Sequence, residues 1–514
     1  MNRLRLLPLL ALALFPLHAA AMDLTATRAA IDARIAQPRF AAARWGIAVV
    51  SLDSGRTLYA HDADKLFLPA STAKLYTAAL VLNGLDTAYR IPTRVLGPAP
   101  DRRGRVDGPL VLYGMGDPSL GADPATADWA DALALQLTAA GVRRIRGDLV
   151  ADATYFAGPP LGDGWEAADL LSGFAAPASA LSVRENQLRL TVTPAARAGE
   201  PAQLVLDPPA ALRLDGRLQT TPAGNRSDVN LYRAPGSGLL HVFGTIAAQA
   251  PARSFRLAMD DPARVAGTEL LQALARHRIE LDGGLRVLHW PQPSEALRAD
   301  AHVLAEVRSP PLGTILRAGL KRSQNLYLQN LLQLAGLREQ AASADPAPPA
   351  DFLGTANWGL RALRQLLGRI GISPSASLIG EGTGLSRRDL TTPNALVRLL
   401  AFLANGPDGG ALRGMLPVAG VDGTLAGRMR GTRAAGNVHA KTGSMTYVNC
   451  LAGYVTSAAG EHLAFAILLN DYDPPPGMSA SAEVDAIAVW LAELGESATG
   501  SGAPASSGER ERIR

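Results

Sequence analysis

The sequence predicts an α/β fold of the α+β type, in which an antiparallel sheet flanked by helices carries a β-rich insertion. Sequence patterns typical of strands occur near both ends of the chain, and several segments with helical spacing lie between them. Between them, from 90 to 307, short apolar runs alternate with Gly, Pro and Asp, a texture typical of β structure. The 514 residues are 47% hydrophobic, enough for a large core, and the length favours two or three domains.

The two ends of the chain are predicted to lie outside the fold. Arg3 and Arg5 precede an apolar run over 6–17, and three alanines at 19–21 form a cleavage site, so residues 1–21 have the pattern of an export signal. No later stretch reaches ~20 uninterrupted apolar residues, so we expect no membrane span. Residues 497–514 are rich in Gly, Ser and Ala and then charged, which predicts a disordered tail.

Apolar spacing and turn residues place the elements of the main domain, which we assign to 22–89 and 308–496. Helical spacing and stop signals predict helices at 24–35, 71–84, 311–337, 358–370 and 484–494. Strands are expected at 45–52 and 56–60, around an Asp-Ser-Gly turn, and as a pair within 451–469.

The insertion over 90–307 is long enough for two small domains. Its strand signals include 109–113, 147–151, 187–192 and 239–246, and helical spacing predicts one helix near 127–140.

Composition excludes several classes of function. The chain has 50 cationic and 46 acidic residues, a net charge of +4, and no run rich in Lys or Arg, which argues against nucleic-acid binding. Cys450 is the only cysteine, so an intramolecular disulfide and a multi-cysteine metal site are excluded. The eight histidines are scattered, and the zinc-peptidase, P-loop and G-x-S-x-G patterns are absent. We therefore expect neither a metal nor a cofactor.

Lysine is rare in this chain, which contains only Lys65, Lys74, Lys321 and Lys441. A lysine amine, unlike a guanidinium, can lose its proton and act as a base. Ser71 precedes Lys74 by three residues at the start of a predicted helix, where positions i and i+3 share a face. The amine could therefore activate the serine hydroxyl as a nucleophile, although an S-x-x-K match alone is a weak signal.

Two further segments carry polar residues of the same kind. Ser323-Gln324-Asn325 stands at the head of a predicted helix, where Ser323 could equally be a simple N-cap. Lys441-Thr442-Gly443-Ser444 lies in a strand pattern, and its lysine and hydroxyls suit a substrate carboxylate. The glycine would let a substrate backbone approach the strand closely.

Together these three motifs resemble the S-x-x-K, S-D-N and K-T-G set that class A β-lactamases and penicillin-binding proteins share. The chain looks like the D-alanyl-D-alanine carboxypeptidase/endopeptidases, the class C low-molecular-mass penicillin-binding proteins. Matching stretches are 64–74, 114–120, 147–156, 321–332, 382–393, 416–425 and 439–455. The resemblance implies a penicillin-binding, β-lactamase-like transpeptidase domain with two smaller domains inserted between the first and second motifs. It also implies a periplasmic location.

The resemblance assigns the catalytic roles to three residues. Ser71 would be the acylated nucleophile, Lys74 its general base, and Ser323 the relay that passes the proton to the leaving amine. The backbone N–H groups of Ser71 and Ser444 would form the oxyanion hole.

The same resemblance assigns substrate contacts. Asn325 would hold the substrate amide, and Lys441 and Thr442, with Gly443 and Ser444 beside them, would bind the terminal carboxylate. Asp152 would be a wall residue of an extended cleft, although it could equally cap a turn. The expected partners are peptidoglycan stem peptides and β-lactams, and the sequence does not specify an oligomeric state.

At two places the residues differ from those usual in the family's motifs. Gln324 stands where aspartate is usual, and Glu381-Gly382-Thr383-Gly384 stands where Asp-Gly-Ser-Gly is usual. Two alternatives to a carboxypeptidase are a serine β-lactamase, which lacks such a large insertion, and a silent cell-wall-binding or penicillin-sensing protein, which would not need every motif residue. We expect the insertion to affect substrate preference and not to be needed for the bond chemistry.

Overall fold

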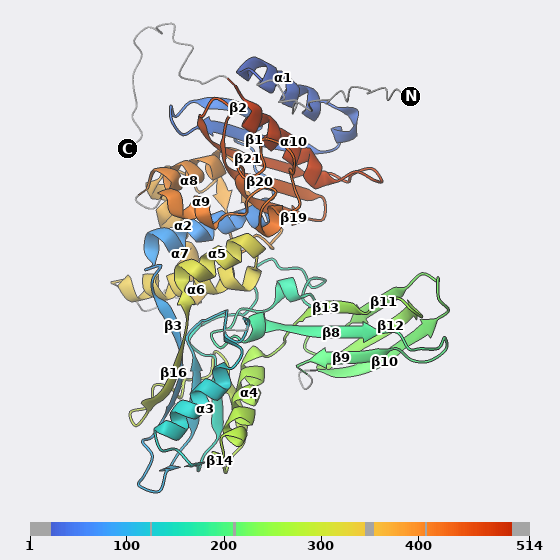
Figure 1. The fold of residues 1–514 in the computed structure, drawn as a ribbon. Coiled ribbons are helices and arrows are strands. Elements are labelled where there is room, and N and C mark those ends of the chain that lie inside the picture. The colour runs from blue at the N-terminus through green and yellow to red at the C-terminus, as the bar shows by residue number, and fades with distance from the viewer. Residues whose placement is uncertain (1–21, 124–125, 209–211, 345–353, 407–408, 496–514) are drawn as a thin grey trace, which may run out of the picture.

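The computed structural model describes residues 22–495, except 124–125, 209–211, 345–353 and 407–408 (Figure 1). The predicted export signal and the predicted tail lie outside the described residues. The first described helix, α1 (Leu24–Ile35), begins after Asp23, whose carboxylate accepts a hydrogen bond from the Ala26 N–H group.

A five-stranded antiparallel sheet forms the centre of the main domain. Its strand order is β19-β20-β21-β1-β2, so strands from both ends of the chain lie side by side, as the sequence predicts. The strands are β1 (Arg44–Ser51), β2 (Thr57–His61), β19 (His439–Met445), β20 (Val448–Thr456) and β21 (His462–Asn470).

Helices cover both faces of this sheet (Figure 1). Ile47 and Val49 of β1 pack into one core with α1 and with α10 (Ala480–Glu493). Ala48, between them, faces the other core, which contains α2 (Lys74–Gly84) and α8 (Pro393–Asn405). Because both faces are buried, the middle parts of the inner strands are apolar and do not alternate with polar residues.

The predicted helix over 311–337 is two helices in the structure. Helix α5 (Leu312–Arg322) ends at Ser323, whose left-handed backbone, with φ 55°, interrupts the helical path before α6 (Asn325–Ala342). The apolar spacing continues across this break, so periodicity alone did not reveal it. The domain also contains α7 (Thr355–Arg369), α9 (Gly409–Met415), β17 (Ser377–Leu378) and β18 (Leu390–Thr391).

The insertion leaves and re-enters the main domain along two paired strands. These are β3 (Arg90–Gly97) and β16 (His302–Pro311), which run antiparallel to each other. The strand β16 continues to Pro311 and so crosses position 307, where the sequence predicts that the insertion ends.

The first part of the insertion is a five-stranded sheet with helices on one face. The strand order is β15-β7-β5-β3-β16, with β5 (Leu110–Gly114), β7 (Leu149–Asp152) and β15 (Leu285–Leu288). A small ladder of β4 (Arg105–Val106), β6 (Arg144–Ile145) and β14 (Glu280–Leu281) lies beside it.

The sequence predicted one helix in this part, and the structure has two. The predicted one is α3 (Trp129–Ala139), and the one missed is α4 (Pro262–Arg276). Asp261 caps α4 by accepting a hydrogen bond from the Arg264 N–H group, and Pro262 occupies its first turn. These are ordinary start signals for a helix. They were obscured by the strand-like segments on either side.

The second part of the insertion is a unit of six strands, which extends as an arm from the body in Figure 1. It contains two three-stranded sheets, in the orders β13-β8-β9 and β10-β12-β11, and their inner residues share one core with the first part. The strands are β8 (Gln187–Thr193), β9 (Gln203–Asp207), β10 (Arg213–Thr221), β11 (Asp228–Tyr232), β12 (Leu239–Ala247) and β13 (Arg253–Ala258).

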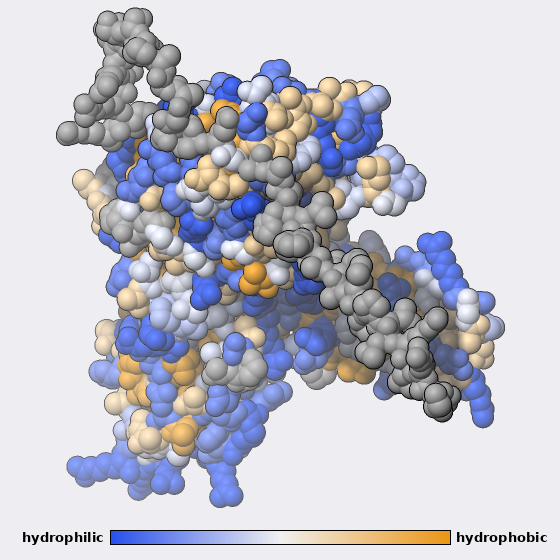
Figure 2. All heavy atoms as spheres, turned by 45° about the horizontal axis from the view of Figure 1, so that its top comes forward, coloured by the Kyte–Doolittle hydropathy of each residue, from blue (hydrophilic) through white to orange (hydrophobic). Residues whose placement is uncertain are grey.

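Mostly hydrophilic side chains cover the face drawn in Figure 2, with apolar ones in separate small patches. Among the described residues, no helix is long and apolar enough to cross a membrane.

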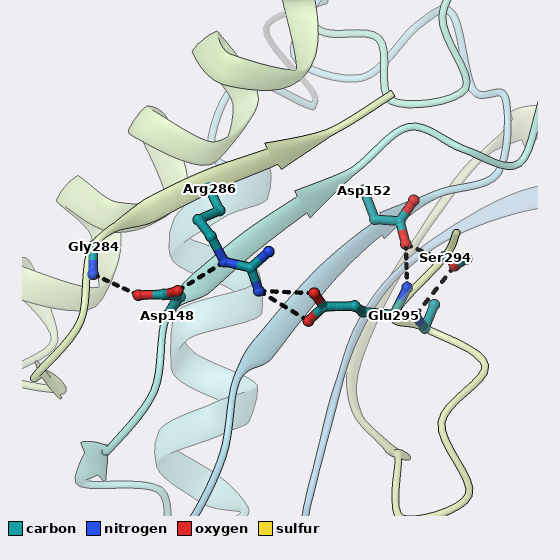
Figure 3. A network of polar contacts seen from close by, with 7 residues as sticks. Asp148, Asp152, Gly284, Arg286, Ser294 and Glu295 are labelled. Atoms are coloured by element: carbon teal, nitrogen blue, oxygen red, sulfur yellow. Dashed lines mark hydrogen bonds and ion pairs between the residues drawn. The ribbon is translucent and has the colours of Figure 1, made fainter. Parts of the chain in front are cut away.

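Asp152, which the sequence placed in the wall of a cleft, is a fully buried turn residue at the end of β7. Its carboxylate accepts hydrogen bonds from the N–H and hydroxyl groups of Thr154, at 2.9 and 2.6 Å. It also accepts bonds from the Ser294 hydroxyl, at 2.7 Å, and from the Glu295 N–H group, at 3.2 Å (Figure 3). A carboxylate with this burial and these partners cannot line a cleft, so the turn-capping alternative agrees with the structure.

An ion-pair chain fastens the same loop to the sheet from the outside. Arg286 of β15 donates hydrogen bonds to Asp148, at 2.7 Å, and to Glu295, at 2.8 Å (Figure 3). These groups are partly exposed, and such pairs contribute little to stability compared with a buried carboxylate.

We predict that Asp152→Ala lowers the free energy of unfolding by about 1–3 kcal/mol, because it leaves buried donors without an acceptor. Asp148→Ala, in the exposed part of the network, is the matched control and should cost less than about 1 kcal/mol. Urea unfolding of both variants measures the difference. Equal effects would contradict the structural role assigned to Asp152.

Candidate active site

Ser71 and Lys74 lie next to each other at the beginning of α2. Ser71 belongs to a 3₁₀ turn, Ala70–Ala73, that leads directly into the helix, so its side chain and that of Lys74 are on the same side. Lys74 Nζ is 2.8 Å from Ser71 Oγ, 2.5 Å from Asn325 Oδ1 and 2.7 Å from the Thr383 carbonyl oxygen. The lysine is fully buried, so these three oxygens replace its water.

Burial lowers the pKa of Lys74 from its usual value near 10.5 to about 7. Desolvation disfavours the charged amine, and the nearby carboxylate of Glu381 opposes that effect in part. Near neutral pH a large fraction of this amine is therefore unprotonated. An unprotonated amine at 2.8 Å can accept the proton of the Ser71 hydroxyl and convert it into a nucleophile.

The second motif lies against the third. Ser323 Oγ accepts a hydrogen bond from Lys441 Nζ at 2.9 Å, and the same ammonium donates to the Thr442 carbonyl at 2.8 Å. Lys441 is also fully buried, and its burial, together with the nearby charge of Lys74, lowers its pKa well below the usual value. The sequence pattern is also compatible with Ser323 as a simple N-cap. In the structure Gln324 caps α6, and Ser323 is in contact with Lys441.

The strand that carries Lys441 runs beside the Ser71 turn. Thr442 Oγ1 is 2.8 Å from Thr424 Oγ1, and Ser444 is exposed. A Cβ atom on Gly443 would lie 2.5 Å from the Pro69 carbonyl oxygen and 3.0 Å from Cys450 Cβ. Glycine is therefore needed here so that the strand can approach the turn that carries Ser71, a reason that the sequence did not indicate.

The Glu381–Gly384 loop supports the same turn from the other side. The Glu381 carboxylate accepts hydrogen bonds from the N–H groups of Thr383, Gly384 and Leu385, and so fixes the carbonyl of Thr383 that faces Lys74. Gly384, with φ 75°, touches the Ala70 carbonyl, where a side chain would not fit. Burial and the neighbouring Glu381 raise the pKa of Asp389 above its usual value.

The insertion also contributes to the cluster, which the sequence analysis did not predict. Asn325 Nδ2 donates a 2.7 Å hydrogen bond to the carbonyl oxygen of Phe174, in the insertion. The two ends of this amide are thus fixed by different parts of the chain, with Lys74 at its oxygen and Phe174 at its nitrogen. A main-chain acceptor leaves no signature in a sequence, so no motif could have indicated Phe174.

The remaining lysines form ion pairs and make no hydrogen bond to Ser71, Lys74 or Lys441. Lys321 is ion-paired with Asp422, at 2.6 Å, and Lys65 is an exposed residue paired with Asp62. Asp152, described above, makes its hydrogen bonds within the insertion and none to the Ser71 cluster. In the described part of the chain, no three His, Cys, Asp or Glu residues are grouped so that they could hold a metal ion.

A cleft of about 900 Å³ opens in front of the second motif. One wall is the segment from Lys321 to Asn325 together with Thr424. The opposite wall comes from the insertion, through Phe174, strand β11 and strand β13. Ser323 and Asn325 of the cluster therefore border a space that the main domain and the insertion share.

Comparison with known proteins assigns the chain to a family. The D-Ala-D-Ala carboxypeptidase 3 (S13) family matches residues 27–494. The chain belongs to this family. It is therefore a peptidase of the carboxypeptidase type, and the resemblance inferred from the motifs is confirmed.

Two curated relatives illustrate the similarity. A D-alanyl-D-alanine carboxypeptidase of Actinomadura sp. is 36% identical over 91% of this chain and 85% of its own length. The D-alanyl-D-alanine carboxypeptidase DacB of Haemophilus influenzae is 27% identical over 83% of this chain and 85% of its own.

The fold is that of a solved member. The crystal structure of penicillin binding protein 4 from H. influenzae superposes with a TM-score of 0.76, covering 90% of this chain and 97% of that one at 24% identity. The predicted fold class, a penicillin-binding domain with inserted β-rich parts, is confirmed.

We predict that Lys74 titrates with a midpoint near pH 7, the value that its burial sets. Because the chain has only four lysines, ¹³Cε-lysine NMR can follow each of them. The Lys74 resonance is identified by its loss in Lys74→Arg. A midpoint above about 9, close to that of a free lysine, would contradict the proposed state of the amine.

Proposed function

We propose that this chain is a serine-type D-alanyl-D-alanine peptidase that cleaves its substrates through an acyl-enzyme on Ser71. The observation that carries the proposal is the 2.8 Å contact between Ser71 Oγ and Lys74 Nζ, an amine whose pKa is lowered to about 7. A hydroxyl beside a buried, partly unprotonated amine at the start of a helix is a suitable nucleophile for acyl transfer.

The first half of the reaction would form an ester. Lys74 takes the proton of the Ser71 hydroxyl while Oγ attacks the carbonyl carbon between the two D-alanines. The N–H groups of Ser71 and Ser444 stabilise the resulting oxyanion. The peptide C–N bond then breaks, and the proton that Lys74 took up reaches the leaving amine through Ser323, which gives one proton and receives another. Water then attacks the ester carbonyl carbon. As the ester C–O bond breaks, a proton of the water returns to Ser71 Oγ and the acyl group leaves as the acid.

Substrate contacts follow from the same arrangement. Asn325 would hydrogen-bond the amide of the acyl part. To do so, one end of its side chain would exchange its present partner, Lys74 or Phe174, for the substrate. Lys441 and Thr442 would bind the terminal carboxylate. The negative charge of that carboxylate favours the protonated form of Lys441, whose pKa is otherwise lowered by burial. Gly443 keeps the strand close to the turn, so that Ser71 and Ser444 can face the same carbonyl oxygen.

The width of the cleft supports cross-linked peptides as a second class of substrate. A space of about 900 Å³ between the second motif and the insertion is larger than a D-Ala-D-Ala terminus requires. We therefore infer endopeptidase activity on peptidoglycan cross-links besides carboxypeptidase activity. Such substrates, and the export-signal pattern at 1–21, favour a periplasmic location.

Covalent reaction with β-lactams follows from the same nucleophile. The H. influenzae structure, with the same fold, has also been solved in complex with a β-lactam. A β-lactamase would need a base that activates water for rapid deacylation. The nearby carboxylate of Glu381 has both oxygens bound by main-chain N–H groups and is therefore a poor candidate for that base. A catalytically silent penicillin-sensing protein would not need a general base, and so would not need a Lys74 amine with a lowered pKa.

Digestion of purified peptidoglycan by the purified enzyme tests the proposal. We expect released D-alanine and a shift from cross-linked to monomeric muropeptides in the chromatogram, both abolished in Ser71→Ala. D-alanine release without cross-link cleavage would remove the endopeptidase part. No product of either kind would contradict the proposed function.

We predict that Lys74→Arg lowers the rate of penicillin acylation at Ser71 by about a thousandfold, because a guanidinium with a pKa above about 12 cannot accept the serine proton. Lys65→Arg, which changes an exposed lysine in the same way, is the matched control and should react like the wild type. Mass spectrometry of the labelled peptide locates and quantifies the adduct. An adduct on another residue, or equal rates in both variants, would contradict the roles given to Ser71 and Lys74.

A further inference from the structure

The backbone at Ser323 needs support from its surroundings. Ser323 has a left-handed conformation, with φ 55° and ψ 38°, which costs free energy for a residue with a side chain. Its hydroxyl contacts Lys441, which fixes the side chain but not the backbone direction. The residues on either side, Arg322 and Gln324, must therefore be held in place for the hydroxyl to remain where it is.

A single carboxylate from the insertion holds both of these neighbours. Glu185 accepts hydrogen bonds from the Arg322 guanidinium, from Gln324 Nε2 at 2.8 Å, and from the Tyr327 hydroxyl at 3.0 Å. The Glu185 side chain is only 12% exposed, although that of Arg322 is 49% exposed, and the bonds of Glu185 to Gln324 and Tyr327 are partly buried. The three donors stand immediately before, immediately after and one helical turn after Ser323.

The turn that presents Glu185 is itself strained and firmly anchored. Arg184, Glu185 and Asn186 all have positive φ, at 52°, 58° and 54°. The buried Asn186 side chain secures this turn, accepting from the Val183 N–H group and donating to the Pro177 carbonyl. Strain of this kind persists where the surroundings fix it, and it is often found at functional positions.

Gln324, which departs from the usual aspartate, complements this arrangement. Its Oε1 accepts a hydrogen bond from the Leu326 N–H group, while its Nε2 donates to Glu185. An aspartate at this position could accept but not donate, and it would place a second negative charge against Glu185. The amide at 324 and the carboxylate at 185 thus form a matched pair.

We propose that Glu185 is a positioning residue, through which the insertion holds the Ser323 hydroxyl in line for proton delivery to the leaving group. The inference rests on the proposed function, because it assigns the relay to Ser323. It also means that the insertion supports the bond chemistry, contrary to the expectation from the sequence. Glu185 does this without touching the substrate, acting only through Arg322, Gln324 and Tyr327.

The chemistry of the leaving group separates positioning from simple stabilisation. A peptide leaves as an amine and needs a proton as its C–N bond breaks. A thioester with the same acyl group leaves as a thiolate, which is stable near neutral pH and needs no proton at that step. A displaced Ser323 should therefore slow peptide cleavage much more than thioester cleavage.

The test compares kcat and KM of full-length Glu185→Ala and Glu185→Gln on an acyl-D-Ala-D-Ala peptide and on the matching acyl-D-Ala thioester. For Glu185→Ala we expect kcat for the peptide to fall about 10- to 100-fold with little change in KM, and kcat for the thioester to fall less than about threefold. Glu185→Gln keeps one of the two acceptor oxygens and should lie between this variant and the wild type. Glu200→Gln, an exposed acid of the same insertion, is the control and should behave like the wild type.

Other outcomes overturn the inference. Unchanged peptide kcat in both Glu185 variants means that the carboxylate does not position Ser323. Equal losses on peptide and thioester mean that it only stabilises the fold, and thermal unfolding of each variant shows that directly. A wild-type enzyme that cleaves neither substrate would contradict the proposed function itself, and this inference with it.

Discussion

The Lys74 side chain is buried among oxygens that come from three separate segments of the chain, Ser71, Asn325 and Thr383. Removing an ammonium from water is unfavourable, and the amine responds by releasing its proton more readily. Its reactivity therefore depends on how completely the surrounding segments exclude water. The close approach of the loop at Gly384 to the Ser71 turn is a direct consequence of that requirement.

The site is consequently formed by several parts of the chain and not by one domain alone. The sheet supplies Lys441, the helices supply Lys74 and Asn325, and the insertion supplies the carbonyl of Phe174. The side chains of Lys74, Asn325 and Lys441 are each oriented by an atom from a distant part of the chain. Such mutual fixation keeps a reactive geometry without the reorganisation that mobile groups would require.

The sequence was sufficient for the three motifs, for the central sheet and for most helices, because apolar spacing and turn residues are local signals. It failed where the deciding contact is distant. The break at Ser323 lies inside a continuous helical pattern, and Asp152 looks the same whether it is exposed or buried. Contacts such as those of Glu185 join residues more than a hundred positions apart and leave no periodicity to detect.

The position of β1 in the sheet has a consequence for how the chain folds. Its partner β21 is almost the whole chain away, with Arg44 opposite Asn470. Until that late segment is available, the first strands can form no more than an isolated hairpin, which is marginally stable in water. The insertion, by contrast, closes on itself between β3 and β16. Completing the sheet thus requires contacts of high sequence separation, and a newly made chain cannot bring its two lysine-bearing motifs together on this sheet before residues 463–470 have been made.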